Sequence, residues 1–103
     1  MAQVVWTLQA LQDLEEIGAY YEQRAPAFGD LLVTEIYTVG DRLSRYPASG
    51  RIIPEFNLYS LREVVIRNYR VLYAYIDHER VNILAIKSSY IPLTDIPGPS
   101  VNP

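Results

Sequence analysis

The stretch of residues 61–76, Leu-Arg-Glu-Val-Val-Ile-Arg-Asn-Tyr-Arg-Val-Leu-Tyr-Ala-Tyr-Ile, constrains the fold more than any other part of the chain. It is rich in β-branched and aromatic residues and contains neither Gly nor Pro, which is typical of strands. The interruption at Arg67-Asn68-Tyr69 predicts a tight turn, because Asn tolerates positive φ. We therefore predict a β-hairpin with one mostly apolar face and a second face that carries arginine or tyrosine.

The N-terminal half predicts a short strand, residues 3–6, followed by two helices. Thr7 suits the N-cap position, and apolar residues recur at helical spacing over residues 8–23. Pro26 suits the first turn of a second helix, which Pro47 ends. Because the loop between the two helices is short, we expect them to lie antiparallel and to cover a sheet.

The second half supplies the remaining strands of a small antiparallel sheet. A short strand at 51–53 precedes the hairpin, and a last strand over 80–90 is apolar on both faces, which predicts a central position. Four prolines after residue 91 disfavour regular structure. We predict an α+β fold: one domain over 1–90, with the N-terminal strand and α-helical hairpin packed on one face of the sheet, and a Pro-rich tail over 91–103.

Composition excludes several classes of function. A chain of 103 residues is large enough for one modest core, and the absence of Cys excludes disulfides and thiol chemistry. The single histidine, His78, lies in a predicted turn, and the scattered glycines form no phosphate-binding loop. We therefore expect no metal and no cofactor. The sequence shows neither a signal peptide nor a membrane span, so we expect a cytoplasmic protein with no membrane partner.

The charges are unevenly distributed. The net charge of −3 argues against a general nucleic-acid binder. Residues 1–35 hold one arginine against six carboxylates, a net charge of −5, whereas residues 42–70 hold six arginines against two carboxylates, a net charge of +4. Guanidinium groups bind carboxylate or phosphate well but do not transfer protons. The predicted target-binding residues are Arg51, Arg62, Arg67 and Arg70; the alternative is that they pair with acidic residues of the same fold.

An enzymatic role would need further groups. A ribonuclease on this surface would use Arg51, Arg62, Lys87 and Tyr90, and Lys87 would need its pKa lowered by about three units from ~10.4 to act near neutral pH. Nothing in the sequence requires such a shift. The residues therefore identify no catalytic group, and they favour a protein that binds a macromolecule over an enzyme.

A series of short motifs, in order along residues 4–90, carries a family resemblance. The motifs are Val5-Trp6-Thr7, Ala10, Asp13-Leu14, Ile17, Tyr20, Pro47, Gly50-Arg51, Pro54-Glu55, Leu61-Arg62-Glu63 and Tyr69-Arg70-Val71-Leu72-Tyr73. Taken together, they resemble the RelE/ParE superfamily of type II toxin–antitoxin toxins. The Gly-Arg, Pro-Glu, Leu-Arg-Glu and Tyr-Arg elements are more similar to the ParE branch.

The resemblance implies a bacterial, cytoplasmic toxin of a plasmid stabilisation type that a small antitoxin holds inactive. The ParE branch is associated with inhibition of DNA gyrase, and the RelE branch with cleavage of mRNA on the ribosome. Nucleic acid is a partner only in the second case. A third alternative is a non-toxic binding module of the same fold.

The antitoxin is expected to be an extended, partly helical segment that lies across the helical hairpin and an exposed sheet edge. Its acidic residues would cover the arginines. The alternative occupant of an apolar edge is a second copy of the chain, which would make a homodimer. The residues predicted to contact the antitoxin are Leu11, Tyr21, Phe28 and Tyr37.

Overall fold

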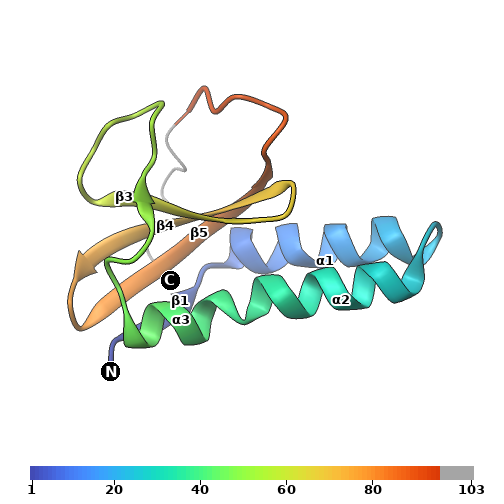
Figure 1. The fold of residues 1–103 in the computed structure, drawn as a ribbon, viewed down its shortest axis with the longest axis horizontal. Helices are drawn as coiled ribbons and strands as arrows, with labels where there is room; N and C mark the ends of the chain where they lie inside the picture. The colour runs from blue at the N-terminus through green and yellow to red at the C-terminus, as the bar shows by residue number, and fades with distance from the viewer. Residues whose placement is uncertain (96–103) are drawn as a thin grey trace.

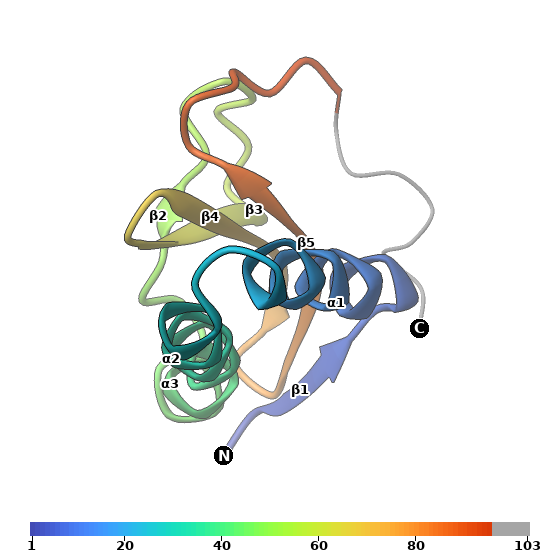
Figure 2. The same ribbon diagram turned by 90° about the vertical axis from the view of Figure 1, so that its right-hand side faces the viewer.

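The computed structural model describes residues 1–95 of the 103-residue chain. Two long antiparallel helices and a short third helix lie on one side of a twisted sheet (Figure 1 and Figure 2). The elements are β1 (Gln3–Trp6), α1 (Leu8–Glu22), α2 (Pro26–Tyr37), α3 (Val39–Arg45), β2 (Arg51–Ile52), β3 (Leu61–Ile66), β4 (Tyr69–Asp77) and β5 (Arg80–Ser88). The predicted α+β architecture, with a helical hairpin on one face of the sheet, is confirmed.

The sheet has five strands in the order β1-β5-β4-β3-β2. The predicted hairpin is present as β3 and β4, and β5 lies between β1 and β4, as its two apolar faces indicated. The sheet is mixed rather than purely antiparallel, because β1 runs parallel to β5. Parallel neighbours need a long crossover connection, and the helices with β2 to β4 supply it here.

The hairpin turn differs in detail from the prediction. Arg67, not Asn68, has the positive φ, 53°. A positive φ at only the first turn residue is the type II′ pattern, which also matches the twist of the strands. The side chain of Arg67 then reaches the carboxylate of Glu35 on α2 through two hydrogen bonds of 2.8 and 3.0 Å. This ion pair fixes the turn against the helical hairpin.

The second predicted helix is divided. It runs from Pro26 to Tyr37, and α3 begins at Val39 after Thr38. The hydroxyl of Thr38 donates to the carbonyl of Glu35 at 2.6 Å, a back-bond that bends helices. Apolar periodicity continues through the break, so the sequence pattern alone does not reveal it.

Both faces of the sheet are covered. The helix-facing side carries the larger core, which includes Val64, Val71 and Tyr73. The far side carries a second cluster, to which Ile53, Leu61, Leu72, Ala74, Leu84 and Ala85 belong, with Phe56 and Leu93 packed on it. The predicted division of the hairpin into one apolar face and one arginine or tyrosine face is therefore wrong. Leu93 belongs to the predicted tail, and residues 96–103 of that tail lie outside the described residues.

Side chains at the start of α1 form hydrogen bonds with the part of β5 that has no neighbouring strand on the β1 side. The strand β1 ends opposite Ile83, so the rest of β5 has no strand neighbour on that side. The hydroxyl of Thr7, the N-cap of α1, donates to the carbonyl of Ile83 at 2.9 Å. The buried carboxylate of Asp13 accepts a hydrogen bond from the amide of Ile86 at 2.9 Å. These contacts join α1 to the centre of the sheet.

We predict that Asp13→Ala lowers the free energy of unfolding by about 1–3 kcal/mol, because the buried amide of Ile86 loses its acceptor. Asp13→Asn keeps an acceptor oxygen of the same shape and should cost less. Urea denaturation of the three proteins measures the difference. Equal stability of the Ala and Asn variants would contradict this role for the carboxylate.

Candidate functional site

A chain of alternating charges crosses the far face of the sheet and includes two of the four predicted target-binding arginines, Arg51 and Arg70. The carboxylate of Glu63 is fully buried and accepts hydrogen bonds from the Nε atoms of Arg51 and Arg70. Arg70 also donates through both terminal nitrogens to Glu55, each at 2.6 Å. The register explains the arrangement, since Arg51 of β2 lies directly opposite Glu63 of β3. These four residues form the far-face ion network.

The network shifts the ionisation of its members. The hydrogen bonds from Arg70 lower the pKa of Glu55 from 4.5 to about 2, and those same bonds raise the pKa of Arg70. The carboxylate of Glu55 also accepts a hydrogen bond from the backbone amide of Leu93 at 3.2 Å. The network thus connects the edge strand, the hairpin, the loop after β2 and the segment after β5.

Arg62 lies on the opposite, helix-facing side of β3. Its guanidinium donates to the carbonyls of Ala48 and Gly50, both at 3.1 Å, and stacks on the ring of Tyr59. The buried hydroxyl of Tyr73 binds the same loop: it donates to the carbonyl of Pro47 at 2.9 Å and accepts from the amide of Gly50 at 2.9 Å. The loop before β2 is therefore held by buried side chains of the hairpin.

Gly50 is required by this close approach. A Cβ atom at this position would lie 2.7 Å from the carbonyl oxygen of Glu63 and 2.6 Å from Cε1 of Tyr73. Neither group has room to move, because Tyr73 is fully buried and the carbonyl belongs to the backbone of β3. The close packing at Gly50 therefore fixes the position of the next residue, Arg51, at the edge of the sheet.

The four predicted target-binding arginines do not form one surface. Arg51 and Arg70 share the far-face ion network, Arg62 lies on the other face, and Arg67 pairs with Glu35 at the hairpin turn. The alternative left open by the sequence, pairing with acidic residues of the same chain, holds for three of the four. The side chain of Arg51 is 62% exposed, whereas that of Arg70 is 7% exposed. Of the network arginines, Arg51 is the one that a partner can reach.

The residues named for a ribonuclease are also separated. Lys87 is exposed and lies directly across from Arg70 on the far face, and Tyr90 follows β5 with 80% of its surface exposed. Arg62 is buried on the other face. Within residues 1–95, Lys87 makes no ion pair with an acidic side chain, which distinguishes it from Arg51, Arg67 and Arg70.

The residues predicted to contact an antitoxin fall into two groups. Tyr21 and Phe28 are half-buried and pack edge to face, with ring centres 5.1 Å apart, where α1 meets α2. Leu11 and Tyr37 are exposed near the opposite end of the helical hairpin. Tyr37 stacks on Trp6 of β1, with ring centres 5.2 Å apart and planes 21° from parallel. Trp6 was not among the predicted contact residues, because the sequence does not show that it lies beside Tyr37.

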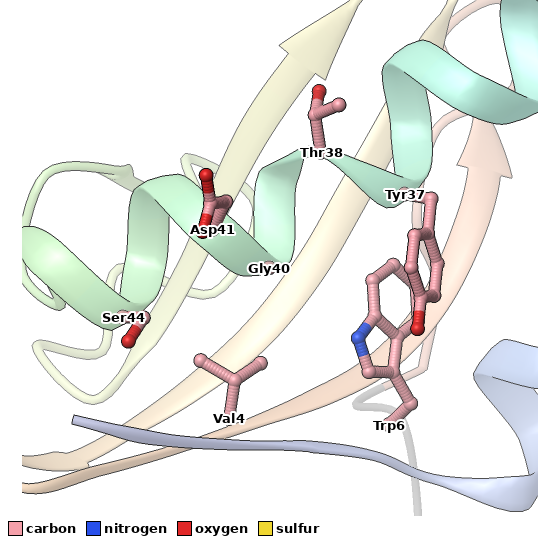
Figure 3. A pocket seen from close by; sticks show the side chains of 7 residues that line it. All are labelled: Val4, Trp6, Tyr37, Thr38, Gly40, Asp41 and Ser44. Carbon is pink, nitrogen blue, oxygen red and sulfur yellow. The ribbon is translucent and has the colours of Figure 1, made fainter. Parts of the chain in front are cut away.

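The stacked pair lies at one end of a groove between β1 and α3. Figure 3 shows the two rings face to face, with the side chains of Val4 and Ser44 farther along. The groove has a volume of about 460 Å³. Its lining is formed by Val4, Trp6, Tyr37, Thr38, Gly40, Asp41 and Ser44. We call this the β1–α3 groove.

Among residues 1–95, no group of three or more His, Cys, Asp or Glu side chains is placed to hold a metal ion. His78 is exposed, and its Nε2 atom lies 3.8 Å from Oε1 of the neighbouring Glu79. In the same part of the chain, no helix has the length and apolar character needed to cross a membrane.

We predict that acid weakens the fold through Glu55. Because its pKa is lower in the folded chain than the usual 4.5, its carboxylate stabilises the fold above about pH 4.5, and this contribution is lost as the pH falls toward 2. Glu55→Gln should therefore be less stable at pH 7 by about 1–3 kcal/mol. It should also lose less stability than the unmodified chain between pH 4.5 and 2.

Denaturant titrations at several pH values measure both effects. Glu22→Gln is a matched control, since Glu22 is an exposed glutamate outside the ion pairs of the described chain. Its pH dependence should follow that of the unmodified protein. Parallel curves for Glu55→Gln and the unmodified protein would show that the contact with Arg70 does not control acid stability.

Comparison with known proteins places these features in a family. The family model described as "ParE toxin of type II toxin-antitoxin system, parDE" matches residues 4–89. The chain is 38% identical over 85 residues to "Putative toxin Y4kP" of Sinorhizobium fredii, which covers 82% of this chain and 85% of that protein. It is 36% identical over 87 residues to "Toxin RelE2" of Caulobacter vibrioides, covering 84% and 94%.

A solved structure has the same fold. The "Chromosomal ParDE TA system from P. aeruginosa" contains a chain that superposes with a TM-score of 0.70, at 20% sequence identity. The match covers 85% of this chain and 96% of that one. The described strands and helices are thus arranged as in that structure.

Proposed function

The chain belongs to the ParE family of type II toxin–antitoxin toxins, and from this premise we propose that it inhibits DNA gyrase by protein binding and is neutralised by a cognate antitoxin. The cytoplasm is the expected location, since it contains the target and the antitoxin. The toxin–antitoxin pair would thereby favour the stable inheritance of the plasmid or chromosomal segment that encodes it. Non-enzymatic action is part of the proposal.

The observation that best supports binding over catalysis is the far-face ion network. Its arginines are held in charge-assisted hydrogen bonds with Glu55 and Glu63, so their guanidinium groups are ordered before a partner arrives. Such groups contact a partner at little further cost in side-chain entropy. They do not transfer protons. The exposed members of this face, Arg51 and Lys87, are the proposed target contacts.

Gyrase inhibition is tested with purified proteins in a supercoiling assay. Arg51→Ala and Lys87→Ala should each raise the concentration needed for half inhibition by about tenfold, equivalent to about 1.4 kcal/mol of binding energy. Arg45→Ala is the matched control, because Arg45 is similarly exposed, at 61%, but lies on α3. It should inhibit like the unmodified chain. Supercoiling that is unaffected at concentrations that stop growth would rule out gyrase as the target.

The second candidate is a RelE-like, ribosome-dependent mRNA endonuclease. The observation that favours it is the exposed Lys87 next to Arg70, a cationic group that makes no ion pair with an acidic side chain in the described chain. Cleavage of mRNA in a translating extract would support it. Loss of cleavage in Lys87→Ala and Tyr90→Phe, with Arg45→Ala still active, would assign the reaction to these residues.

Growth of cells on induced expression distinguishes both toxin mechanisms from a non-toxic binding module. Induced expression without an antitoxin should stop growth if either toxin mechanism operates. Normal growth, with folded protein present in the cells, would instead favour a binding module of the same fold without toxicity. Co-expression of the adjacent reading frame should restore growth under the proposed function.

A further inference from the structure

Arg51 is the member of the far-face ion network that keeps unused hydrogen-bond donors. Its Nε atom donates to Glu63, and no hydrogen bond within residues 1–95 uses its two terminal nitrogens. Its side chain is 62% exposed, so these nitrogens belong to a group that solvent reaches. A guanidinium holds its N–H donors in one plane, in a fixed fork. The fork of Arg51, meaning its two terminal nitrogens, is therefore available to a partner.

Arg70 shows how such a fork is filled in this chain. Like Arg51, it donates from Nε to the buried carboxylate of Glu63. Its two terminal nitrogens donate to the two oxygens of Glu55, both at 2.6 Å. This bidentate pairing is the arrangement in which a guanidinium and a carboxylate match best. Arg51 has the first of these two contacts and lacks the second.

Glu63 determines where the fork of Arg51 lies. Its carboxylate is fully buried and shares its oxygens between two arginines, since Oε2 accepts from Arg51 and Oε1 accepts from Arg70. The bond to Nε holds one side of the planar guanidinium against the protein and restricts the positions of the terminal nitrogens. A partner that binds the fork therefore has little side-chain motion left to restrict.

The charge around the fork favours a single carboxylate over a nucleic-acid backbone. The network contains two arginines and two glutamates, so its net charge is zero, and Lys87 adds one positive charge across from Arg70. Binding of a polyanion uses several free cations and usually a surplus of Lys and Arg. This chain has a net charge of −3. One bidentate contact beside one lysine is suited to one acidic side chain.

An exposed apolar side chain borders the network on the same face. Val65 follows Glu63 by two positions on β3, and it lies directly across from Arg70 on β4. Residues two apart on a strand share a face, so Val65 belongs to the far face with the network. It is 47% exposed. A segment that places a carboxylate on Arg51 and an apolar residue on Val65 matches this surface.

We propose that the target protein places an Asp or Glu carboxylate in the fork of Arg51, in the bidentate geometry that Arg70 already has with Glu55. Glu63 is then a positioning residue: it is too deeply buried to contact the target and acts by holding Arg51. The inference deepens the proposed function and rests on it, because it takes gyrase as the partner. It adds the chemical class of the group that is bound and a role for a buried carboxylate.

Arg51→Lys tests the fork, because lysine keeps the positive charge and lacks the planar pair of donors. In the supercoiling assay with purified gyrase, it should raise the concentration needed for half inhibition by about tenfold, nearly as much as Arg51→Ala does. Arg45→Lys is the matched control, since Arg45 is also an exposed arginine, and it should inhibit like the unmodified chain. Full inhibition by Arg51→Lys would show that charge alone suffices and would overturn the inference.

A double-mutant cycle tests the positioning role of Glu63. Glu63→Gln keeps the shape of the side chain, removes its charge and should weaken inhibition. In the Arg51→Ala background the same change should have almost no further effect, because its influence passes through Arg51. Equal weakening in both backgrounds would indicate a merely structural contribution and would overturn the positioning role. Urea denaturation verifies that each variant is folded; Arg51→Lys keeps the inference falsifiable even where Glu63→Gln is too unstable to purify.

A charge exchange identifies the group that the fork binds. Arg51→Glu should abolish inhibition, and a gyrase variant with one exposed Asp or Glu replaced by Arg should be inhibited by it again. Binding of the unmodified chain is also measured with gyrase alone and with a duplex oligonucleotide alone. Binding to the duplex that depends on Arg51, or binding to gyrase only when DNA is present, would assign the fork to a phosphate and overturn the inference.

Failure of this inference and failure of the proposed function give different results. Gyrase inhibition that is equal for the unmodified chain and Arg51→Lys would leave the function intact and refute the bidentate contact. An unmodified chain that neither binds gyrase nor slows supercoiling would refute the proposed function and the inference together.

Discussion

The buried carboxylate of Glu63 is the interaction on which most of the second half of the chain depends. A charge of this kind is stable inside a protein only when its partners remain in place. Arg51 and Arg70 provide them from two different strands, and Arg70 extends the contacts to Glu55 and so to Leu93. The edge strand, the loop after it and the segment after β5 are consequently positioned by one set of hydrogen bonds.

This network changes what the arginines contribute to function. An excess of arginine in residues 42–70 predicted a free cationic surface, but Arg67 and Arg70 are neutralised within the chain and Arg62 is bound to backbone carbonyls. On the helical hairpin, Glu35 pairs with Arg67, whereas Glu15, Glu16, Glu22 and Asp30 form no ion pair within the described chain. The outer surface of the helical hairpin is therefore mostly acidic, and few of the arginines in residues 42–70 remain free to form a cationic surface.

The sequence predicted best those features that depend on residues close together in the chain. Helix α1 and strand β5 follow from the apolar spacing of neighbouring residues; the helix was predicted one residue too long and the strand two residues too long. The pairing of Arg70 with Glu55 depends on a loop that folds back over the sheet, which no spacing pattern reveals. The parallel pairing of β1, the break at Thr38 and the stack of Trp6 on Tyr37 likewise depend on contacts between distant segments.

Candidate sites were harder to predict for the same reason. Leu11 and Tyr37, which were predicted to contact an antitoxin, are exposed on the helical hairpin. Tyr21 and Phe28 are also large apolar or aromatic residues on these helices, yet they pack against each other where α1 meets α2. Only the crossing of α1 and α2 decides which aromatic side chains reach the surface.

The exposed strand edges of the sheet are limited in three different ways, at β2, at β5 and at β1. Exposed edges invite pairing with other chains, so proteins usually shorten or cover them. The edge strand β2 has only two residues, and the uncovered half of β5 is capped by Thr7 and Asp13. At β1, the amide and the carbonyl of Ala2 are bound by Ser44 of α3, and the groove between β1 and α3 lies beside the strand. Shortening of the strand, capping by side chains and contact with a helix thus each limit the exposed length of one strand edge.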